Sequence, residues 1–270
     1  METIGFIGAG NMAEALIKGI IKSGLCEAKN ILISDIQSDR LEKLCTEYKI
    51  SSLEGNTELV QKADILVLSI KPQNMQVVLE EIAGSLKKTA LVISIAAGVT
   101  TTHIGTVLGD VPIIRVMPNT PALIGHGAAA LYATHKAEPN LKKALKIFSA
   151  VGKAFVVSDE NMIDAVTALS GSGPAYFFLL MEEMIKAGIE LGLSEDLARD
   201  LVLQTAKGSA LLAEQRNEQA ESVSALRQKV TSPGGTTEAA IKVFENDQFG
   251  ATVLMALQAA AERSKQLSAS

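Results

Sequence analysis

The chain has 270 residues, which suits two domains better than one, and 47% of them are hydrophobic, so each half can fill a core. A formal net charge of −5, with no local Lys/Arg cluster to offset it, argues against nucleic-acid binding. Two cysteines, Cys26 and Cys45, are too few for a disulfide framework or a metal knuckle, so we expect reduced thiols, a cytoplasmic protein and no metal site.

Short β-branched runs alternate with amphipathic helical patterns in the first half of the chain. The runs are apolar at nearly every position, as expected when both faces of a parallel sheet are covered. This βαβ series predicts an α/β, doubly wound sheet of Rossmann type. In chain order we expect strand Thr3–Ile7, helix Ala13–Lys22, strand Ile31–Ser34, helix Asp39–Glu47, strand Ile65–Ile70, helix Met75–Leu86, strand Leu91–Ile95, helix Thr101–Leu108, strands Ile113–Val116 and Ala128–Tyr132, helix Asn140–Val151 and strand Ala154–Val157.

After Ser158 only helical periods remain. They predict an all-helical domain over residues 159–270, after a dinucleotide-binding domain over residues 1–158. Because some of these helices are apolar on every side, we expect them to pair two subunits in a homodimer; a deeply buried central helix is the alternative. No membrane span is expected, since Gly-Ser-Gly-Pro and Pro-Asn-Thr-Pro interrupt the apolar stretches. The predicted helices are Asn161–Leu169, Ala175–Leu191, Glu195–Glu214, Thr237–Glu245 and Gly250–Leu267.

A glycine-rich turn, Gly8-Ala9-Gly10-Asn11-Met12-Ala13, joins the first strand to the first helix. Gly8 permits a tight turn, Gly10 lets the backbone approach a pyrophosphate, and Ala13 allows close helix–strand packing. The helix N-terminus then offers free N–H groups to phosphates. The position inside a βαβ unit favours dinucleotide binding over an ordinary strand-to-helix turn.

The second strand ends at Asp35, where an acidic residue accepts hydrogen bonds from ribose hydroxyls and repels a 2′-phosphate. Ile36 follows it, where enzymes specialised for the phosphorylated cofactor usually carry Arg. We therefore expect NADH to be used better than NADPH. Arg40, or Ser34 with Asn56, offers a way to accommodate the phosphate, and Asp35 has the alternative role of capping the next helix.

Three further segments lie at the carboxyl ends of predicted strands, the edge where open α/β sheets bind ligands. They are Ser69–Pro72, Ile95–Gly98 and Met117–Pro121. Lys71 is a candidate phosphate or ribose contact, or else a solvent-exposed lysine. Two prolines stiffen the last loop, around Asn119, which suits it to orient a nicotinamide ring.

Two unusual segments lie in the helical half: Ser170–Tyr176 and Val230–Glu238. In the second, Pro-Gly-Gly forces a turn before a helix whose first N–H groups and two threonine hydroxyls form a natural carboxylate site. Alternatively, both segments are ordinary loops, each of which leads into a helix. Neither turn contains His, Cys, Asp or Lys, and we expect His103, His126 and His135 at the surface. A carbonyl reductase needs a proton donor, whereas a protonated imine does not, so a neutral pocket favours C=N reduction by orientation.

The chain resembles the pyrroline-5-carboxylate reductase family. The resemblance rests on Gly5–Ala13, Lys71-Pro72, Ala96–Thr100, Met117–Pro121, Leu169–Tyr176 and Val230–Thr237, which span nearly the whole chain. It implies NAD(P)H-dependent reduction of L-1-pyrroline-5-carboxylate to L-proline, the last step of proline biosynthesis. It also implies a Rossmann domain followed by a helical dimerisation domain, with dimers often assembling into larger rings.

The resemblance also implies roles for individual residues. Thr237 would be catalytic, its hydroxyl bonding the ring nitrogen of the imine, and an acidic substrate-side residue corresponds to Glu218 or Glu221. With the motifs above, the cofactor candidates are Ile7, Gly8, Ala9, Gly10, Asn11, Met12, Ser34, Asp35, Asn56, Ser69, Ile70, Lys71, Pro72, Ile95, Ala96, Ala97 and Asn119, and the substrate candidates are Val230, Ser232, Gly234, Gly235, Thr236 and Thr237.

Two other functions compete. A β-hydroxyacid dehydrogenase shares the two-domain plan but needs a catalytic Lys on the helix after Gly-Ser-Gly, where the first Lys is Lys186. A dinucleotide sensor without turnover would not need the Thr-Ser-Pro-Gly-Gly-Thr-Thr segment.

Overall fold

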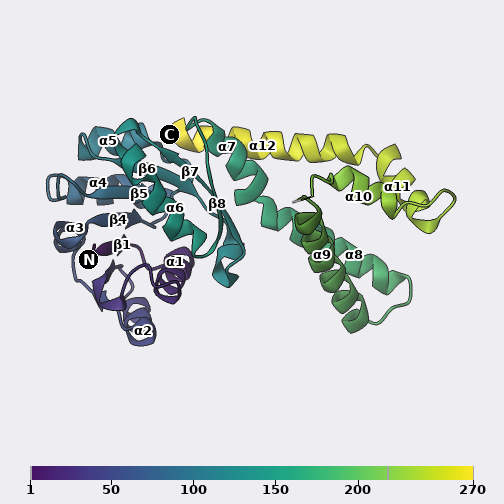
Figure 1. Ribbon diagram of the computed structural model, residues 1–270, viewed down its shortest axis with the longest axis horizontal. Helices are drawn as coiled ribbons and strands as arrows, with labels where there is room; N and C mark the ends of the chain where they lie inside the picture. The colour runs from purple at the N-terminus through teal and green to yellow at the C-terminus, as the bar shows by residue number, and fades with distance from the viewer. Residues whose placement is uncertain (1, 218, 270) are drawn as a thin grey trace. The chain divides into compact units, whose positions relative to one another are not determined.

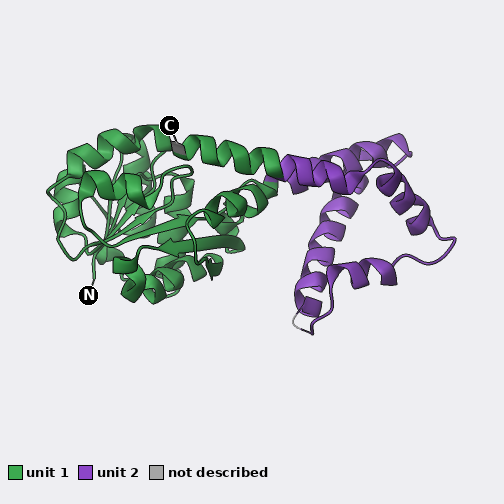
Figure 2. Cartoon of the chain, turned by 90° about the horizontal axis from the view of Figure 1, so that it is seen from above, with its two compact units in different colours: residues 1–174, 258–270 green, residues 175–257 purple. Residues whose placement is uncertain are grey.

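The computed structural model describes residues 2–217 and 219–269. The chain forms two compact units, one of Met1–Pro174 with Gln258–Ser270 and one of Ala175–Leu257 (Figure 2). The last helix, α12 (Phe249–Ala269), therefore gives its C-terminal turns to the first unit.

An eight-stranded sheet forms the centre of the first unit, in the order β3-β2-β1-β4-β5-β6-β7-β8 (Figure 1). Every neighbouring pair is parallel except β6 and β7, which are antiparallel. This confirms the predicted doubly wound sheet. The strands are β1 (Ile4–Ile7), β2 (Ile31–Ser34), β3 (Ser51–Ser52), β4 (Ile65–Leu68), β5 (Leu91–Ser94), β6 (Ile113–Met117), β7 (Gly127–Ala133) and β8 (Gly152–Val156).

Two hydrophobic cores cover the two faces of this sheet. Along β1, Phe6 belongs to one core and Ile7 to the other, because successive side chains of a strand point to opposite faces. The first core takes residues from α1 (Asn11–Lys22), α2 (Ser38–Tyr48) and α6 (Leu141–Ser149). The second takes residues from α3 (Asn56–Lys62), α4 (Met75–Ile82) and α5 (Thr101–Leu108). Burial on both faces explains the unbroken apolar runs of the strands.

Some short elements were not predicted from the sequence. Neither β3 nor α3 was predicted, since two residues and seven residues are too short for a clear period. The expected end of α4 at Leu86 is wrong, because the helix stops at Ile82, just before Gly84 with its φ of +75°. Short 3₁₀ turns fill other connections: η1 (Ala28–Asn30), η2 (Pro72–Asn74), η3 (Thr120–Ile124) and η4 (His135–Asn140).

The expected break between two helices at residue 169 is wrong. Instead α7 (Met162–Val166) continues through a π-turn, η5 (Thr167–Gly171), almost directly into α8 (Gly173–Glu190). A π-turn admits one extra residue, so the chain passes Pro174 without a full interruption. By length and composition alone this stretch could cross a membrane, but only 22% of its most apolar window is buried, and a helix covered by a partner subunit gives the same signal.

The second unit contains only helices among its described residues. They are the main part of α8, α9 (Glu195–Asn217), α10 (Val223–Lys229), α11 (Thr236–Asn246) and the start of α12. The seven residues of α10 were not predicted; Ser222 caps it by accepting the Ala225 N–H. Large apolar side chains stay exposed in this unit, among them Phe177 at 65% and Met255 at 60%. So much exposed apolar surface is typical of a face that another protein chain covers.

Candidate functional site

A cavity of about 760 Å³ opens at the carboxyl edge of the sheet. It lies where β1 and β4 adjoin although the chain visits β2 and β3 between them, which is the switch point of the strand order. Nine of the predicted cofactor residues line it: Ile7, Gly8, Gly10, Ser34, Asp35, Asn56, Ser69, Ile70 and Lys71.

The glycine-rich turn is held against the loop that follows β4. Gly8 has a φ of +95°, and a Cβ there would lie 2.6 Å from the Ser69 carbonyl oxygen, so only glycine fits. The Ser69 hydroxyl donates to the Gly8 carbonyl at 2.6 Å. By contrast, a Cβ on Gly10, which precedes α1, would meet open space. The turn is thus rigid on its inner side and open on its outer side, as a phosphate site at a helix N-terminus requires.

Asp35 is fixed by the backbone N–H groups of Ala9 and Gln37. One carboxylate oxygen accepts from Ala9 N at 2.6 Å and the other from Gln37 N at 2.9 Å. Each oxygen retains a lone pair for a further donor such as a ribose hydroxyl. Gln37, and not Asp35, is the N-cap residue of α2, so the capping alternative is wrong.

The groups that were candidates for binding a 2′-phosphate already have partners. Arg40 donates to the Ala9 carbonyl at 2.7 Å and forms an ion pair with Glu14. The Ser34 hydroxyl donates to Asn56 Oδ1 at 2.9 Å, and Asn56 Nδ2 donates to Glu81 at 2.7 Å.

Sequence reasoning missed several residues that line the cavity, notably Glu54 and Glu81. Glu81 lies on α4, far in sequence from any glycine-rich motif, and no local signal identifies it. The others are Ile36, Gln37, Gly55, Gln73, Asn74 and Val78. The remaining cofactor candidates do not line the cavity: Ala9, Asn11, Met12, Pro72, Ile95, Ala96, Ala97 and Asn119.

A network of buried polar groups lies behind this edge of the sheet. The Arg115 side chain on β6 is 3% exposed and donates to Glu160 at 3.1 Å. Glu160 also accepts from the backbone and hydroxyl of Thr101, the first residue of α5, at 2.8 and 2.6 Å. Within the described part of the chain, Arg115 Nε and Nη2 have no hydrogen-bond partner. Among the described residues, Glu160 is the carboxylate that forms an ion pair with this buried guanidinium.

The second candidate site is the start of α11. The N–H of Gly235 donates to the Ser232 carbonyl at 3.0 Å, and Gly234, with a φ of +72°, completes the turn. The first intrahelical bond is from Ala239 N to the Gly235 carbonyl. The N–H groups of Thr236 and Thr237 are thus free to bind an anion, and their hydroxyls bond to no other described residue.

One acidic residue, Glu238, stabilises this turn, whereas Glu221 pairs with basic residues outside it. Glu238 accepts the Gly234 N–H at 2.8 Å, and this bond, together with Lys242, holds the pKa of Glu238 below its usual range. Glu221 pairs with Lys229 and, more distantly, with Arg216. The other acidic candidate, Glu218, lies outside the described residues.

Few of the described side chains suit the competing kinds of reaction. All three histidines are exposed, as predicted. Lys186 pairs with Glu182 and Glu183 on the surface of α8. Within residues 2–217 and 219–269 no three His, Cys, Asp or Glu side chains gather as metal ligands.

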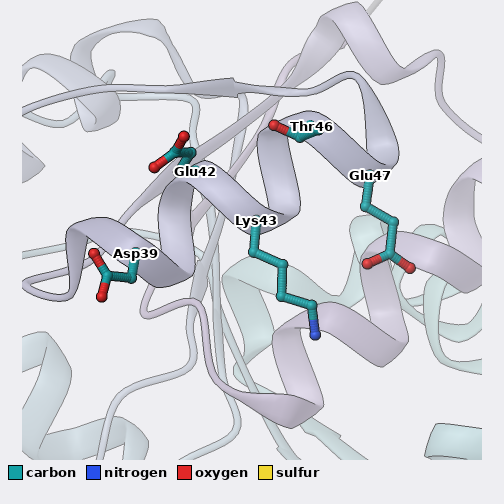
Figure 3. A pocket seen from close by; sticks show the side chains of 5 residues that line it. All are labelled: Asp39, Glu42, Lys43, Thr46 and Glu47. Atoms are coloured by element: carbon teal, nitrogen blue, oxygen red, sulfur yellow. The ribbon is translucent and has the colours of Figure 1, made fainter.

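A surface hollow over α2 is no competitor for the cavity at the sheet edge. Figure 3 shows that its lining side chains all project from that one helix and do not converge. They are Asp39, Glu42, Lys43, Thr46 and Glu47.

Comparison with known proteins matches both parts of the chain. A family described as pyrroline-5-carboxylate reductase dimerisation matches residues 160–267, and one described as NADP oxidoreductase coenzyme F420-dependent matches residues 3–98. The pyrroline-5-carboxylate reductase of Pseudomonas aeruginosa is 48% identical over 98% of this chain and 96% of its own length.

Two solved structures are similar to this protein over nearly its whole length. A pyrroline-5-carboxylate reductase from Coxiella burnetii is 41% identical, with a TM-score of 0.91 over 99% of this chain and 98% of that one. A pyrroline carboxylate reductase from Plasmodium falciparum with NADP bound is 32% identical, with a TM-score of 0.87 over 99% and 98%.

Proposed function

The chain belongs to the pyrroline-5-carboxylate reductase family, and on that premise we propose how its residues reduce L-1-pyrroline-5-carboxylate to L-proline, the last step of proline biosynthesis. The enzyme is an oxidoreductase that uses a nicotinamide dinucleotide. When bound, the nicotinamide supplies the hydride that adds to the imine carbon. The fit of the fold to this cofactor rests on the open outer side of Gly10 at the mouth of the cavity.

The cavity at the sheet edge is the proposed cofactor site. The turn from Ile7 to Met12 would bind the pyrophosphate, and Asp35 would bind the ribose beside adenine. Ser69–Pro72 and Ile95–Ala97 would continue the contacts along the carboxyl edge. Asn119 stands apart, because both polar atoms of its side-chain amide already bond within the protein.

The start of α11 is the proposed substrate site. The free N–H groups after Gly234-Gly235 would bind the carboxylate, and the Thr237 hydroxyl would bond the ring nitrogen. Val230 and Ser232 flank the turn, and Glu238 keeps it closed. Orientation by neutral groups is sufficient for this reaction, because hydride addition neutralises a positive charge that the protonated imine already carries.

We propose further that NADH is the better cofactor. Three carboxylates, Asp35, Glu54 and Glu81, line the cavity, and Lys71 is its one lysine. A 2′-phosphate would add about −2 charge beside these carboxylates. The three side chains that could have received it, Arg40, Ser34 and Asn56, each already donate to protein acceptors.

The direct test follows the absorbance of NADH, and separately of NADPH, in the presence of pyrroline-5-carboxylate. We expect both to be oxidised, with a higher kcat/KM for NADH. If neither is oxidised although NADH binds, the dinucleotide site stands and the proline-forming activity is refuted.

Asp35→Asn should raise the ratio of NADPH to NADH efficiency about tenfold, since it removes one negative charge from the ribose end, worth about 1.4 kcal/mol. Glu42→Gln removes the same charge from the outer face of α2, away from the cavity, and should leave the ratio unchanged. An equal change in both variants would mean that net charge, not contact with the ribose, sets the preference.

The helical part forms oligomers, and we propose homodimers that assemble into larger rings. Exposed Phe177, Phe178 and Met255 support a subunit interface. We also propose functional domains at 1–158 and 159–270, supported by the match to residues 160–267, although the turns up to Pro174 pack with the sheet. Two free cysteines support a cytoplasmic location.

A further inference from the structure

The π-turn η5 contains a carbonyl group, that of Ser170, whose regular α-helical donor is missing. In an α-helix the carbonyl of residue 170 accepts a hydrogen bond from the N–H of residue 174. Residue 174 is proline, which has no N–H, and its ring would clash with that carbonyl in regular helix geometry. The π-turn relieves the clash by bonding Ser172 N to the Thr167 carbonyl at 2.8 Å.

The missing donor comes from another part of the fold. Asn119 Nδ2 donates to the Ser170 carbonyl at 3.0 Å, across 51 residues of sequence. The orientation of the amide is fixed, because Asn119 Oδ1 accepts the Ala128 N–H at 2.8 Å and a donor there can meet only an oxygen. Asn119 is also held by the chain, since Pro118 and Pro121 restrict the loop around it.

The same loop and the same turn are packed directly on each other. A Cβ on Gly171 would lie 2.5 Å from Cε at the flexible end of the Met117 side chain, so the turn packs against the last residue of β6. β6 ends at the carboxyl edge of the sheet, the edge that carries the cofactor cavity. The Asn119–Ser170 bond therefore joins this edge to the Gly-Ser-Gly-Pro segment.

We propose that Asn119 is a positioning residue that replaces the N–H which Pro174 lacks, and so holds the Ser170–Gly173 segment in the conformation needed for turnover. The proposal rests on the function proposed above for its kinetic consequence. It assigns to Asn119 no contact with the cofactor.

A double-mutant cycle tests the bond. Asn119→Ala leaves the Ser170 carbonyl without a donor, and we expect kcat to fall about tenfold and the thermal midpoint to fall about 3 °C, with the Kd for NADH within about twofold of wild type. Pro174→Ala returns an N–H four residues after Ser170. When Asn119→Ala is added to the Pro174→Ala variant, the falls in log kcat and in the thermal midpoint should therefore be about half those seen in the wild-type background. The cost that remains comes from the lost hydrogen bond to Ala128.

Two further variants complete the design. Asn119→Asp keeps an acceptor for the Ala128 N–H but has no donor for Ser170, so it should lose only the part of the Asn119→Ala cost that depends on Pro174. Asn161→Ala, an exposed asparagine whose side chain makes no hydrogen bond to described residues, should change neither measurement.

The results of these measurements distinguish a positioning role of Asn119 from the other roles it could have. A cost of Asn119→Ala that is the same in the wild type and in the Pro174→Ala variant would overturn the proposal. A large rise in the Kd for NADH with unchanged kcat would overturn it too, making Asn119 a cofactor contact. If wild type oxidises no NADH, the kinetic role falls with the proposed function, while the thermal cycle still decides whether Asn119 stands in for the missing N–H.

Discussion

Thr237→Ala should lower kcat for pyrroline-5-carboxylate about 100-fold while the Kd for NADH stays within about twofold of wild type. The reason is that its hydroxyl, which has no partner among the described residues, is the proposed donor to the substrate ring nitrogen. The cofactor cavity contains no residue of α11, so loss of the hydroxyl does not reach it. Steady-state kinetics and a separate titration of NADH binding measure the two effects.

Thr231 offers a matched control in the same loop. Its hydroxyl donates to the Arg227 carbonyl at 2.7 Å and so is occupied within the protein. Thr231→Ala should leave kcat within about threefold, and Thr237→Ser, which retains a hydroxyl, should recover much of the loss. Unchanged kinetics in Thr237→Ala would remove the role assigned to Thr237 and leave the family assignment intact.

Glu160→Ala should destabilise the protein by about 3–5 kcal/mol, because it leaves the buried Arg115 guanidinium without a counter-charge. It also removes the acceptor for two hydrogen bonds from Thr101. Glu160→Gln keeps one acceptor oxygen and should lose less. Urea unfolding followed by circular dichroism suits this measurement, since the chain contains no tryptophan. The protein concentration must be fixed, because oligomerisation makes the stability depend on it.

Asp110→Ala is the control for the loss of an ion pair as such. Asp110 pairs with Lys136 at 2.7 Å, but its side chain is 91% exposed, and we expect a change below about 1 kcal/mol. Equal costs for Glu160→Ala and Asp110→Ala would contradict the importance of the buried network.

Features that depend on neighbouring residues could be predicted before the structure was known. Apolar runs bounded by glycine and polar turns located the main strands, and the turn from Gly8 to Ala13 located the helix N-terminus beside the cavity. The motif order gave the family, which the comparisons confirm. These features are local, since side-chain period and backbone freedom act within a few residues along the chain.

Which polar groups remain available for a ligand could not be predicted in this way, because it depends on contacts between distant segments. From the sequence, Arg40 was a candidate for binding the 2′-phosphate, yet it bonds to Ala9 and Glu14, each more than 20 residues away. Asn119 looked like a ligand contact, yet its amide is used by Ser170 and Ala128. Glu81, on α4, lines the cavity although no sequence motif identifies it. A side chain finds such partners only after the elements have packed, because distant segments compete for the same donors and acceptors, and no sequence period encodes that competition.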